Sequence, residues 1–223
     1  MSSLLNNFTE ANKSEAVRTL IVDSTPNQAF FFMTALSVCM ATVGLLINNA
    51  AVVIGSMLIA PILSPILGIA MGVVMSDRQL IGRSLLTVAK GGALSAGIAF
   101  IVTLFFPDRQ QVLGPEILGR TEPSLAYLVI AVAAGLAVAF ARMKPDLNET
   151  LPGVAISVAL IPPLSVVGIG LALFNWSVAS GAFLLFLVNI FGIVFAGLLM
   201  FSLMNLYVKR GIAATEMRRS EEE

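Results

Sequence analysis

The chain has 223 residues, of which 57% are hydrophobic and only 12% are charged. This balance differs strongly from that of a soluble globular domain, so we expect most of the chain to lie in lipid. Thirteen Lys and Arg residues balance thirteen Asp and Glu residues, which argues against a basic surface for nucleic acid. The sequence contains no His, which excludes imidazole metal sites and Ser-His catalysis. We therefore expect neither an enzyme nor a cofactor.

Residues 1–28 form the first segment, and they lack the basic start, apolar core and cleavage site of a secretory signal. We expect this segment to be retained and cytoplasmic. Within it, residues 9–22 mix charged residues with apolar ones at near-helical spacing, namely Ala16, Val17, Leu20 and Ile21. This pattern predicts a short amphipathic helix at the membrane surface. A flexible, solvated segment is the alternative.

Six apolar stretches follow, and each has close to the ~20 residues that a helix needs to span the hydrocarbon core of a bilayer. They cover residues 30–47, 50–75, 80–106, 125–141, 151–174 and 180–208. Because only helices satisfy the backbone in lipid at these lengths, the sequence predicts an all-α polytopic membrane protein with six transmembrane helices. We assign residues 29–107 to a first unit, 108–124 to an external loop, 125–208 to a second unit and 209–223 to a cytoplasmic tail.

The connections between these stretches differ in length and charge. Only Asn48 and Asn49 separate the first two stretches, and a short segment around Asn175 separates the last two, so both connections are predicted to be tight hairpins. Lys and Arg are enriched in cytoplasmic loops. One side holds Lys13, Arg18, Arg78, Arg83, Arg142, Lys144, Lys209, Arg210, Arg218 and Arg219, and the other holds Arg109 and Arg120. This asymmetry predicts that both termini are cytoplasmic.

The two units contain a repeated pattern. A shift of 101 residues places Val53, Ser56, Pro61, Leu63 and Ser64 on Val154, Ser157, Pro162, Leu164 and Ser165. With small changes of the shift, Asn48 aligns with Asn148 at 100 residues and Lys90 aligns with Asn189 at 99 residues. A chance match of small and apolar residues is the alternative. If each unit has three spans, an odd number, the second unit enters the membrane from the opposite side, which predicts two inverted three-helix repeats.

Proline occurs in the middle of the second helix of each repeat. The first copy reads Ala60-Pro61-Ile62-Leu63-Ser64-Pro65, and the second reads Ile161-Pro162-Pro163-Leu164-Ser165. Because proline lacks an amide hydrogen and clashes with the preceding turn, both helices are predicted to be broken. Ser64 before Pro65 further predicts a helix start with Ser64 as its cap.

Two such helix starts would direct their positive ends at the membrane centre, which favours a carboxylate or another small anion. Hydroxyl groups could come from Ser56, Ser64, Ser157 and Ser165. We therefore predict a substrate site formed by these serines and by Pro61, Pro65, Pro162 and Pro163. The alternative is a pair of packing kinks, since Pro is common in membrane helices.

Two polar residues lie inside the third and sixth spans. Lys90 could neutralise an anionic solute, or its long stem could extend to the cytoplasmic headgroups. Asn189 is expected in a cavity or in a hydrogen bond between helices. No Asp or Glu lies deep in a span, which leaves Asp146 and Glu149 near the fifth span as candidates for binding a coupling ion. The matched pair Asn48 and Asn148 completes the set of coupling candidates.

Three segments resemble those of a known family: AVVIGSMLIAPILSPILGIAMG, EILGRTEPS and LPGVAISVALIPPLSVVGIGLAL, the last followed by a Trp and an apolar span. Together they resemble the prokaryotic membrane family called domain of unknown function 389, over roughly residues 30–206. The resemblance implies an integral protein of the prokaryotic inner membrane, without an assigned activity. It also implies that many relatives carry an additional soluble segment, which we expect this chain to lack.

These observations favour a secondary transporter of a small polar or anionic solute, working by alternating access around the broken helices. The alternatives are an ion or small-solute channel and a non-transporting membrane scaffold. The expected partners are the lipid bilayer, the solute and a coupling ion. Stretches of small residues, such as Gly91-Gly92-Ala93, permit close helix approach, and we expect a homo-oligomer, with packing within one chain as the alternative.

Overall fold

The computed structural model describes residues 10–106, 113–144 and 160–206, and the regular structure within them is helical. The elements in chain order are α2 (Glu10–Ser24), α3 (Gln28–Leu46), α4 (Ala50–Met57), α5 (Leu63–Met75), α6 (Arg78–Leu104), α7 (Pro115–Leu118), α8 (Leu125–Ala141), α10 (Ile161–Ala172) and α11 (Trp176–Leu203). In this part of the chain, α3, α6 and α11 are long and apolar enough to cross a membrane. The predicted all-helical, membrane-type fold is therefore confirmed at this level.

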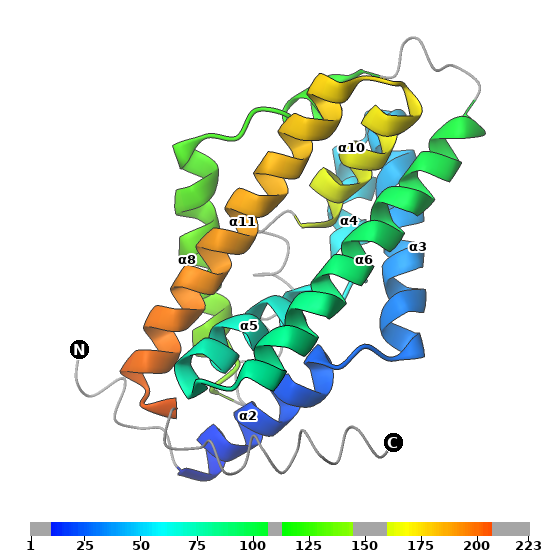
Figure 1. Cartoon of the computed structure of the whole chain (residues 1–223). Coiled ribbons are helices and arrows are strands. Elements are labelled where there is room, and N and C mark those ends of the chain that lie inside the picture. The colour runs from blue at the N-terminus through cyan, green and yellow to red at the C-terminus, as the bar shows by residue number, and fades with distance from the viewer. Residues whose placement is uncertain (1–9, 107–112, 145–159, 207–223) are drawn as a thin grey trace.

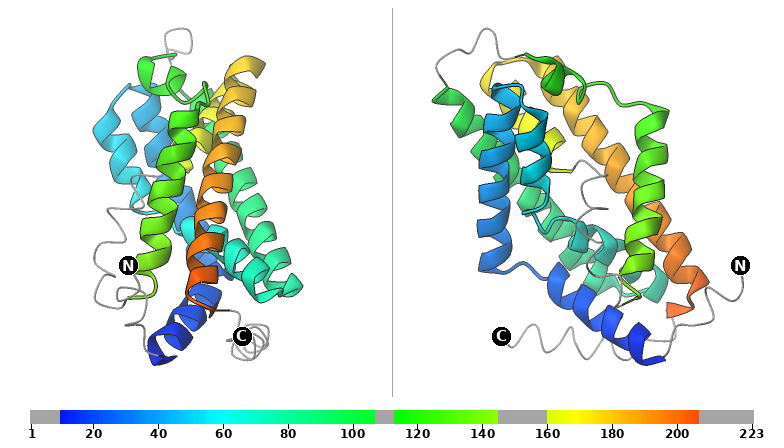
Figure 2. Two further views of the ribbon diagram at one scale, coloured as in Figure 1. Left: turned by 90° about the vertical axis from the view of Figure 1, so that its left-hand side faces the viewer. Right: turned by 180° about the vertical axis from the view of Figure 1, so that it is seen from behind.

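The long helices run in two opposite directions. Figure 1 shows α3 and α6 running from the end of the molecule that holds α2 to the end that holds α7, whereas α8 and α11 run the other way. We call these ends the α2 end and the α7 end. In both views of Figure 2, α8 and α11 lie side by side. Each of the shorter helices α5 and α10 packs against both α6 and α11.

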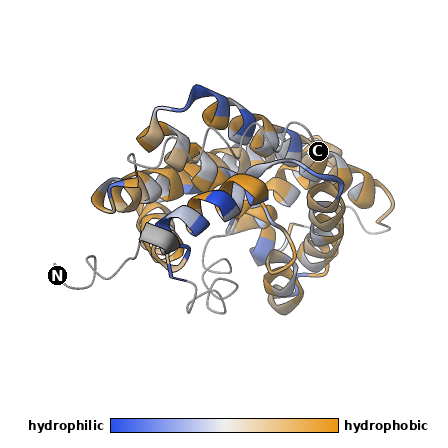
Figure 3. Cartoon of the chain, turned by 90° about the horizontal axis from the view of Figure 1, so that it is seen from below, coloured by the Kyte–Doolittle hydropathy of each residue, from blue (hydrophilic) through white to orange (hydrophobic). Residues whose placement is uncertain are grey.

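Helix α2 packs against the bundle at the α2 end. Ala16, Val17, Leu20 and Ile21, the apolar residues of the predicted amphipathic helix, are buried in one cluster with residues of α5 and α6. Figure 3 looks onto this end and shows hydrophilic residues on α2 in front of mostly hydrophobic helices. Burial of one apolar face against the other helices explains why this charged segment is part of the fold.

Three tight turns between helices have the same geometry. Each contains one residue in the left-handed conformation, with φ of 53–54°, followed by the residue that caps the next helix. The left-handed residues are Asn48, Ser76 and Phe174, and the following caps are Asn49, Asp77 and Asn175. In each turn the cap's own N–H donates to a glycine carbonyl of the preceding helix at 2.8 Å. The hairpins predicted at Asn48-Asn49 and near Asn175 are thus present.

Glycines allow close contact between helices in residues 29–107 and in residues 125–208, which we call the first and second halves. A Cβ atom built on Gly91 of α6 would lie 3.4 Å from the ring of Phe30 in α3. One built on Gly192 of α11 would lie 2.6 Å from the Cβ atom of Ala131 in α8. Phe30 and Ala131 differ by 101 in number, and so do Gly91 and Gly192. The close contacts of α3 with α6 and of α8 with α11 therefore involve residues at the same spacing.

A second pair of contacts, between the two halves, follows the same spacing. A Cβ atom on Gly168 of α10 would lie 2.3 Å from the carbonyl oxygen of Ala96 in α6. One on Gly197 of α11 would lie 3.5 Å from the Leu67 side chain and 2.8 Å from the Cβ atom of Ala70, both in α5. Leu67 and Gly168 differ by 101, as do Ala96 and Gly197. The crossing of α10 over α6 and that of α5 over α11 thus involve residue pairs at the same spacing.

Substitution of Gly168 tests this packing. Gly168→Ala should lower the free energy of unfolding by about 1–3 kcal/mol, because the added methyl group meets backbone atoms of α6 and forces the helices apart. The measurement is the midpoint of thermal unfolding of the purified protein in detergent. Gly97→Ala, where the added atom has nothing within 4 Å, is the matched control and should not lower the midpoint. Equal midpoints for the two variants would contradict the crossing described here.

Candidate functional site

The second apolar stretch is broken, as its prolines predict. Helix α4 ends at Met57 and α5 begins at Leu63, with Pro61 in the segment between them. The predicted cap is wrong, because Ile62 precedes the helix and Ser64 makes no capping hydrogen bond. Pro65 is accommodated at the third helical position, since the N–H groups of a first turn have no partner within the helix.

The matching helix of the second half also begins at its prolines. Helix α10 starts at Ile161, so Pro162 and Pro163 lie in its first turn, and both are buried. A Cβ atom on Gly91 would lie 3.8 Å from the Ile62 side chain before α5, and one on Gly92 would lie 3.6 Å from Leu164 of α10. The two helix starts thus lie against neighbouring residues of α6. From there α5 runs towards the α2 end and α10 towards the α7 end (Figure 1).

A cavity of about 490 Å³ lies at the break in the first half, and we call it the break cavity. Its walls come from the connection between α2 and α3, the start of α3, the break itself and the end of α8. The lining residues are Asp23, Thr25, Asn27, Ala29, Phe30, Met33, Leu58, Ile59, Ala60, Pro61, Leu63, Ser64 and Arg142. This volume falls within the range of small-molecule sites, ~300–1,000 Å³.

Arg142, directly after α8, provides the positive charge of the break cavity. Its Nη1 donates to the carboxylate of Asp23 at 2.8 Å, and its Nη2 donates to the Ser64 hydroxyl at 2.7 Å. The Arg142 side chain is 18% exposed and that of Asp23 is 39% exposed. Among the described residues, the buried Nε of Arg142 has no hydrogen-bond partner. A guanidinium group is therefore fixed beside the helix break and retains donor capacity.

Ser24 fixes the end of α2 to the break. Its hydroxyl donates to the Leu20 carbonyl at 2.6 Å and also lies 3.0 Å from the Ser64 carbonyl. The Ser24 carbonyl in turn accepts a hydrogen bond from Thr87 of α6 at 3.3 Å. The α2–α3 connection is thus tied to both α5 and α6, which holds Asp23 at the cavity.

The other predicted serines have different surroundings. Ser56 is fully buried, and its hydroxyl donates to the Val53 carbonyl at 2.6 Å, while its own carbonyl accepts from Ser37. Ser165 is also fully buried, and its hydroxyl has no hydrogen-bond partner among the described residues. Neither serine lines the break cavity. Ser157, together with the coupling candidates Asp146, Asn148 and Glu149, lies outside the described residues.

Lys90 and Asn189 do not share one environment. Lys90 is exposed on α6, whereas Asn189 of α11 is 4% exposed. At the spacing of 101 found in the helix contacts, Asn189 corresponds in sequence to Val88 and not to Lys90. Neither residue lines the break cavity. The structure therefore does not bring these two predicted residues to the cavity.

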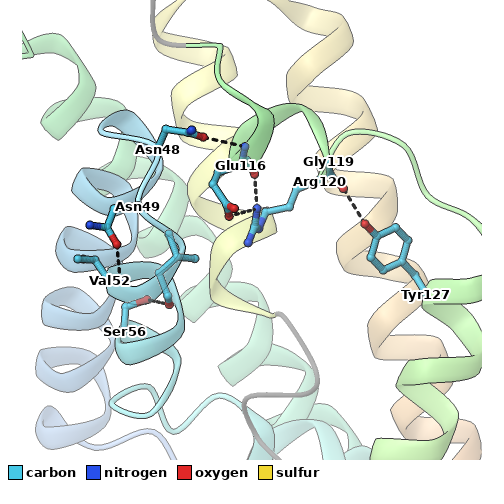
Figure 4. Close-up of polar contacts among 9 residues, drawn as sticks. Asn48, Asn49, Val52, Ser56, Glu116, Gly119, Arg120 and Tyr127 are labelled. Atoms are coloured by element: carbon cyan, nitrogen blue, oxygen red, sulfur yellow. Dashed lines mark hydrogen bonds and ion pairs between the residues drawn. The ribbon is translucent and has the colours of Figure 1, made fainter.

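Asn48 lies at the α7 end, where it holds α7. Figure 4 shows its side-chain oxygen accepting from the N–H of Glu116 at 3.1 Å. Arg120 donates to the Glu116 carbonyl and pairs with the Glu116 carboxylate at 2.9 Å. The Tyr127 hydroxyl donates to the Gly119 carbonyl at 2.8 Å, which connects α7 to the start of α8. Asn48 therefore contacts α7 at the end of the molecule opposite the break cavity.

The match to known proteins is consistent with this architecture. Residues 57–195 match the family model described as "Domain of unknown function (DUF389)", which is more than half of the chain. The chain belongs to this family. The DUF389 match includes the break, α6, α8, α10 and most of α11. It ends before the last turns of α11 and begins after α2 and α3.

One curated relative is an uncharacterized protein of Methanocaldococcus jannaschii. It is 27% identical over 170 residues, which make up 76% of this chain and 52% of the relative. The chain therefore spans about half the length of the curated relative it matches. No solved structure matches the chain.

Sequence reasoning did not identify Arg142 and Asp23 as site residues. Arg142 contributed only to the count of basic residues, and Asp23 directly follows the predicted amphipathic helix of residues 9–22. The two residues are 119 positions apart, and neither belongs to a motif. The one available signal was the position of Arg142 directly after an apolar helix, where an arginine can fold back towards the bundle.

A double-mutant cycle tests the ion pair. Arg142→Gln should lower the midpoint of thermal unfolding by a few degrees, since it removes both the pair and the hydrogen bond to Ser64. The coupling free energy between Arg142→Gln and Asp23→Asn should be below about 1 kcal/mol, because Asp23 is more than one third exposed and water screens the pair.

Arg78→Gln is the control for loss of one positive charge at the same end of the molecule. Arg78 is exposed at the start of α6, where a positive charge is unfavourable, so its removal should not lower the midpoint. A coupling free energy of zero, with Arg142→Gln as stable as the unmodified protein, would contradict the pair.

Proposed function

We propose that the protein is a secondary transporter of a small polar or anionic solute, and that the solute binds in the break cavity. The observation that carries this proposal is the guanidinium group of Arg142, held at an interrupted helix in a cavity of suitable volume. Withdrawing most of a charged side chain from water, here to 18% exposure, is costly unless the charge is paired, and Asp23 pairs with it. In many secondary transporters the solute site lies at interrupted helices.

The proposal includes six spans arranged as two inverted repeats. Its support is the opposite direction of α3 and α6 relative to α8 and α11, and the spacing of 101 in two independent sets of helix contacts. In this arrangement α4 and α5 together form the broken second span of the first repeat. Helix α10 forms the second part of the corresponding span in the second repeat. Inverted repeats allow one half to rock against the other around a fixed site, which is the basis of alternating access.

The orientation is also a proposal. Basic residues described at the α2 end are Lys13, Arg18, Arg78, Arg83, Arg142 and Lys144, whereas Arg120 lies at the α7 end. Since basic loops stay in the cytoplasm, the α2 end and both termini would be cytoplasmic, in the inner membrane of a prokaryote. The break cavity would then be reached from the cytoplasm in this conformation.

Thiol accessibility tests this orientation. In a Cys39→Ala background, Ala60→Cys should react with a membrane-impermeant maleimide in inside-out vesicles but not in intact spheroplasts, because Ala60 lines the cavity at the α2 end. Leu118→Cys, exposed on α7, is the matched control and should show the reverse pattern. Labelling of both cysteines from the same side of the membrane would exclude this orientation.

Transport by the purified protein is the direct test of function. Proteoliposomes should show saturable uptake and counterflow of a solute found by thermal-shift screening, since binding to the folded state raises its apparent stability. Arg142→Gln and Ser64→Ala should reduce uptake about tenfold or more, if each loses one charge-assisted hydrogen bond worth ~1.5–3 kcal/mol. Ser180→Ala, at an exposed hydroxyl on α11, is the control and should transport normally.

Two outcomes would decide against the transporter. Uncoupled conductance far above carrier turnover would identify a channel, in which the broken helices line a continuous pore. Full activity of Ser64→Ala and Arg142→Gln variants in cells, together with no uptake in proteoliposomes, would favour a membrane scaffold.

A further inference from the structure

We propose that the break cavity binds a zwitterionic solute of amino-acid size, whose carboxylate pairs with Arg142 and whose ammonium pairs with Asp23. This inference rests on the proposed function and names its substrate class. Its starting point is the charge of the cavity wall. Asp23 and Arg142 are the charged residues that line the cavity, and their side chains are joined at 2.8 Å. The cavity thus presents one negative and one positive group, with no net charge.

A simple anion would bind poorly to such a wall. To reach Arg142 it must displace Asp23 or share the guanidinium with it, and either arrangement leaves two negative groups close together. An anion bound to Arg142 also leaves the Asp23 carboxylate without its partner. An amine without a carboxylate meets the same difficulty at Arg142. Asp23 and Arg142 together therefore disfavour solutes that carry a net charge.

A zwitterion can supply a new partner to Asp23 and to Arg142 at the same time. Its carboxylate takes the place of Asp23 on the planar guanidinium, which binds carboxylates through two parallel N–H groups. Its ammonium donates to the Asp23 carboxylate, which accepts several hydrogen bonds when ionised. Asp23 is 39% exposed at the end of α2, so its side chain has room to move away from Arg142. One ion pair is exchanged for two.

The remaining wall suits the body of such a molecule. Thr25 and Asn27 add neutral polar groups, and Phe30, Met33 and Leu58 add an apolar surface. An α-amino acid with an apolar side chain combines these features within about 490 Å³.

Three matched probes test the solute class: leucine, 4-methylpentanoate, which lacks the amino group, and 3-methylbutylamine, which lacks the carboxylate. Thermal-shift and calorimetric titrations of the full chain in detergent measure their affinities. Leucine should bind at least about tenfold more tightly than either analogue, the ratio expected for one ion pair worth ~1.4 kcal/mol. Repeating the titrations with alanine, propionate and ethylamine separates charge from side-chain size.

Two variants give reciprocal results that loss of folding cannot mimic. In Asp23→Asn the guanidinium loses its internal carboxylate, so leucine should bind about tenfold or more weakly while 4-methylpentanoate gains affinity. In Arg142→Gln the carboxylate of Asp23 is unpaired, so 3-methylbutylamine should gain affinity instead. Arg78→Gln should leave all three affinities unchanged.

The results distinguish failure of the zwitterion proposal from failure of the transport proposal. If 4-methylpentanoate binds the unmodified protein as tightly as leucine, the zwitterion proposal is wrong and transport of an anion stands. If leucine and alanine bind with the expected selectivity but are not taken up by proteoliposomes, the zwitterion site stands and the proposed transport is wrong. If neither amino acid binds, or if Asp23→Asn and Arg142→Gln leave the affinity order unchanged, the zwitterion proposal is overturned.

Discussion

The architecture depends on one constraint, which is that backbone hydrogen-bonding groups have no water to bind in the hydrocarbon core. In the described part of the chain the second apolar stretch is helical except at its prolines, where α4 ends at Met57 and α5 begins at Leu63. An interruption of this kind is tolerated only where protein or a water-filled cavity surrounds it. Here α2, α3, α6 and the end of α8 surround the interruption, and the break cavity is the space between them. The position of the candidate site is therefore a consequence of the break.

Small residues bring the surrounding helices close enough to enclose the break. Gly168 and Gly197 permit contacts that a side chain would prevent, one against α6 and the other against α5. Without a strong hydrophobic force between helices in lipid, such close van der Waals contact contributes much of the association free energy. These contacts recur at one spacing in the two halves of the bundle, and Arg142, which follows α8 of the second half, lies at the break in the first half.

The sequence predicts the local features well, since these follow from a few neighbouring residues. The bounds of α8 agree with the apolar stretch 125–141, and the break follows from Pro61 and Pro65. The start of α5 at Leu63 could not be derived, because a first turn accepts serine and proline at several positions. The contact of Arg142 with Asp23 could not be derived either, as no local rule links residues that far apart. Ser56 shows a third limit, since its hydroxyl binds the backbone of its own helix and is not free for a solute.

The pairing of Asp23 with Arg142 also bears on how the chain is assembled. The ribosome adds residues from the amino terminus onward. Helix α2 is synthesised well before α8. The ribosome adds 119 further residues after Asp23 before it reaches Arg142, the partner of the Asp23 carboxylate. The helices from α3 to α6 can pack during that interval, whereas the wall of the cavity that contains Arg142 is added later. The first half of the bundle is thus built with an open side, and the arrival of α8 completes the enclosure.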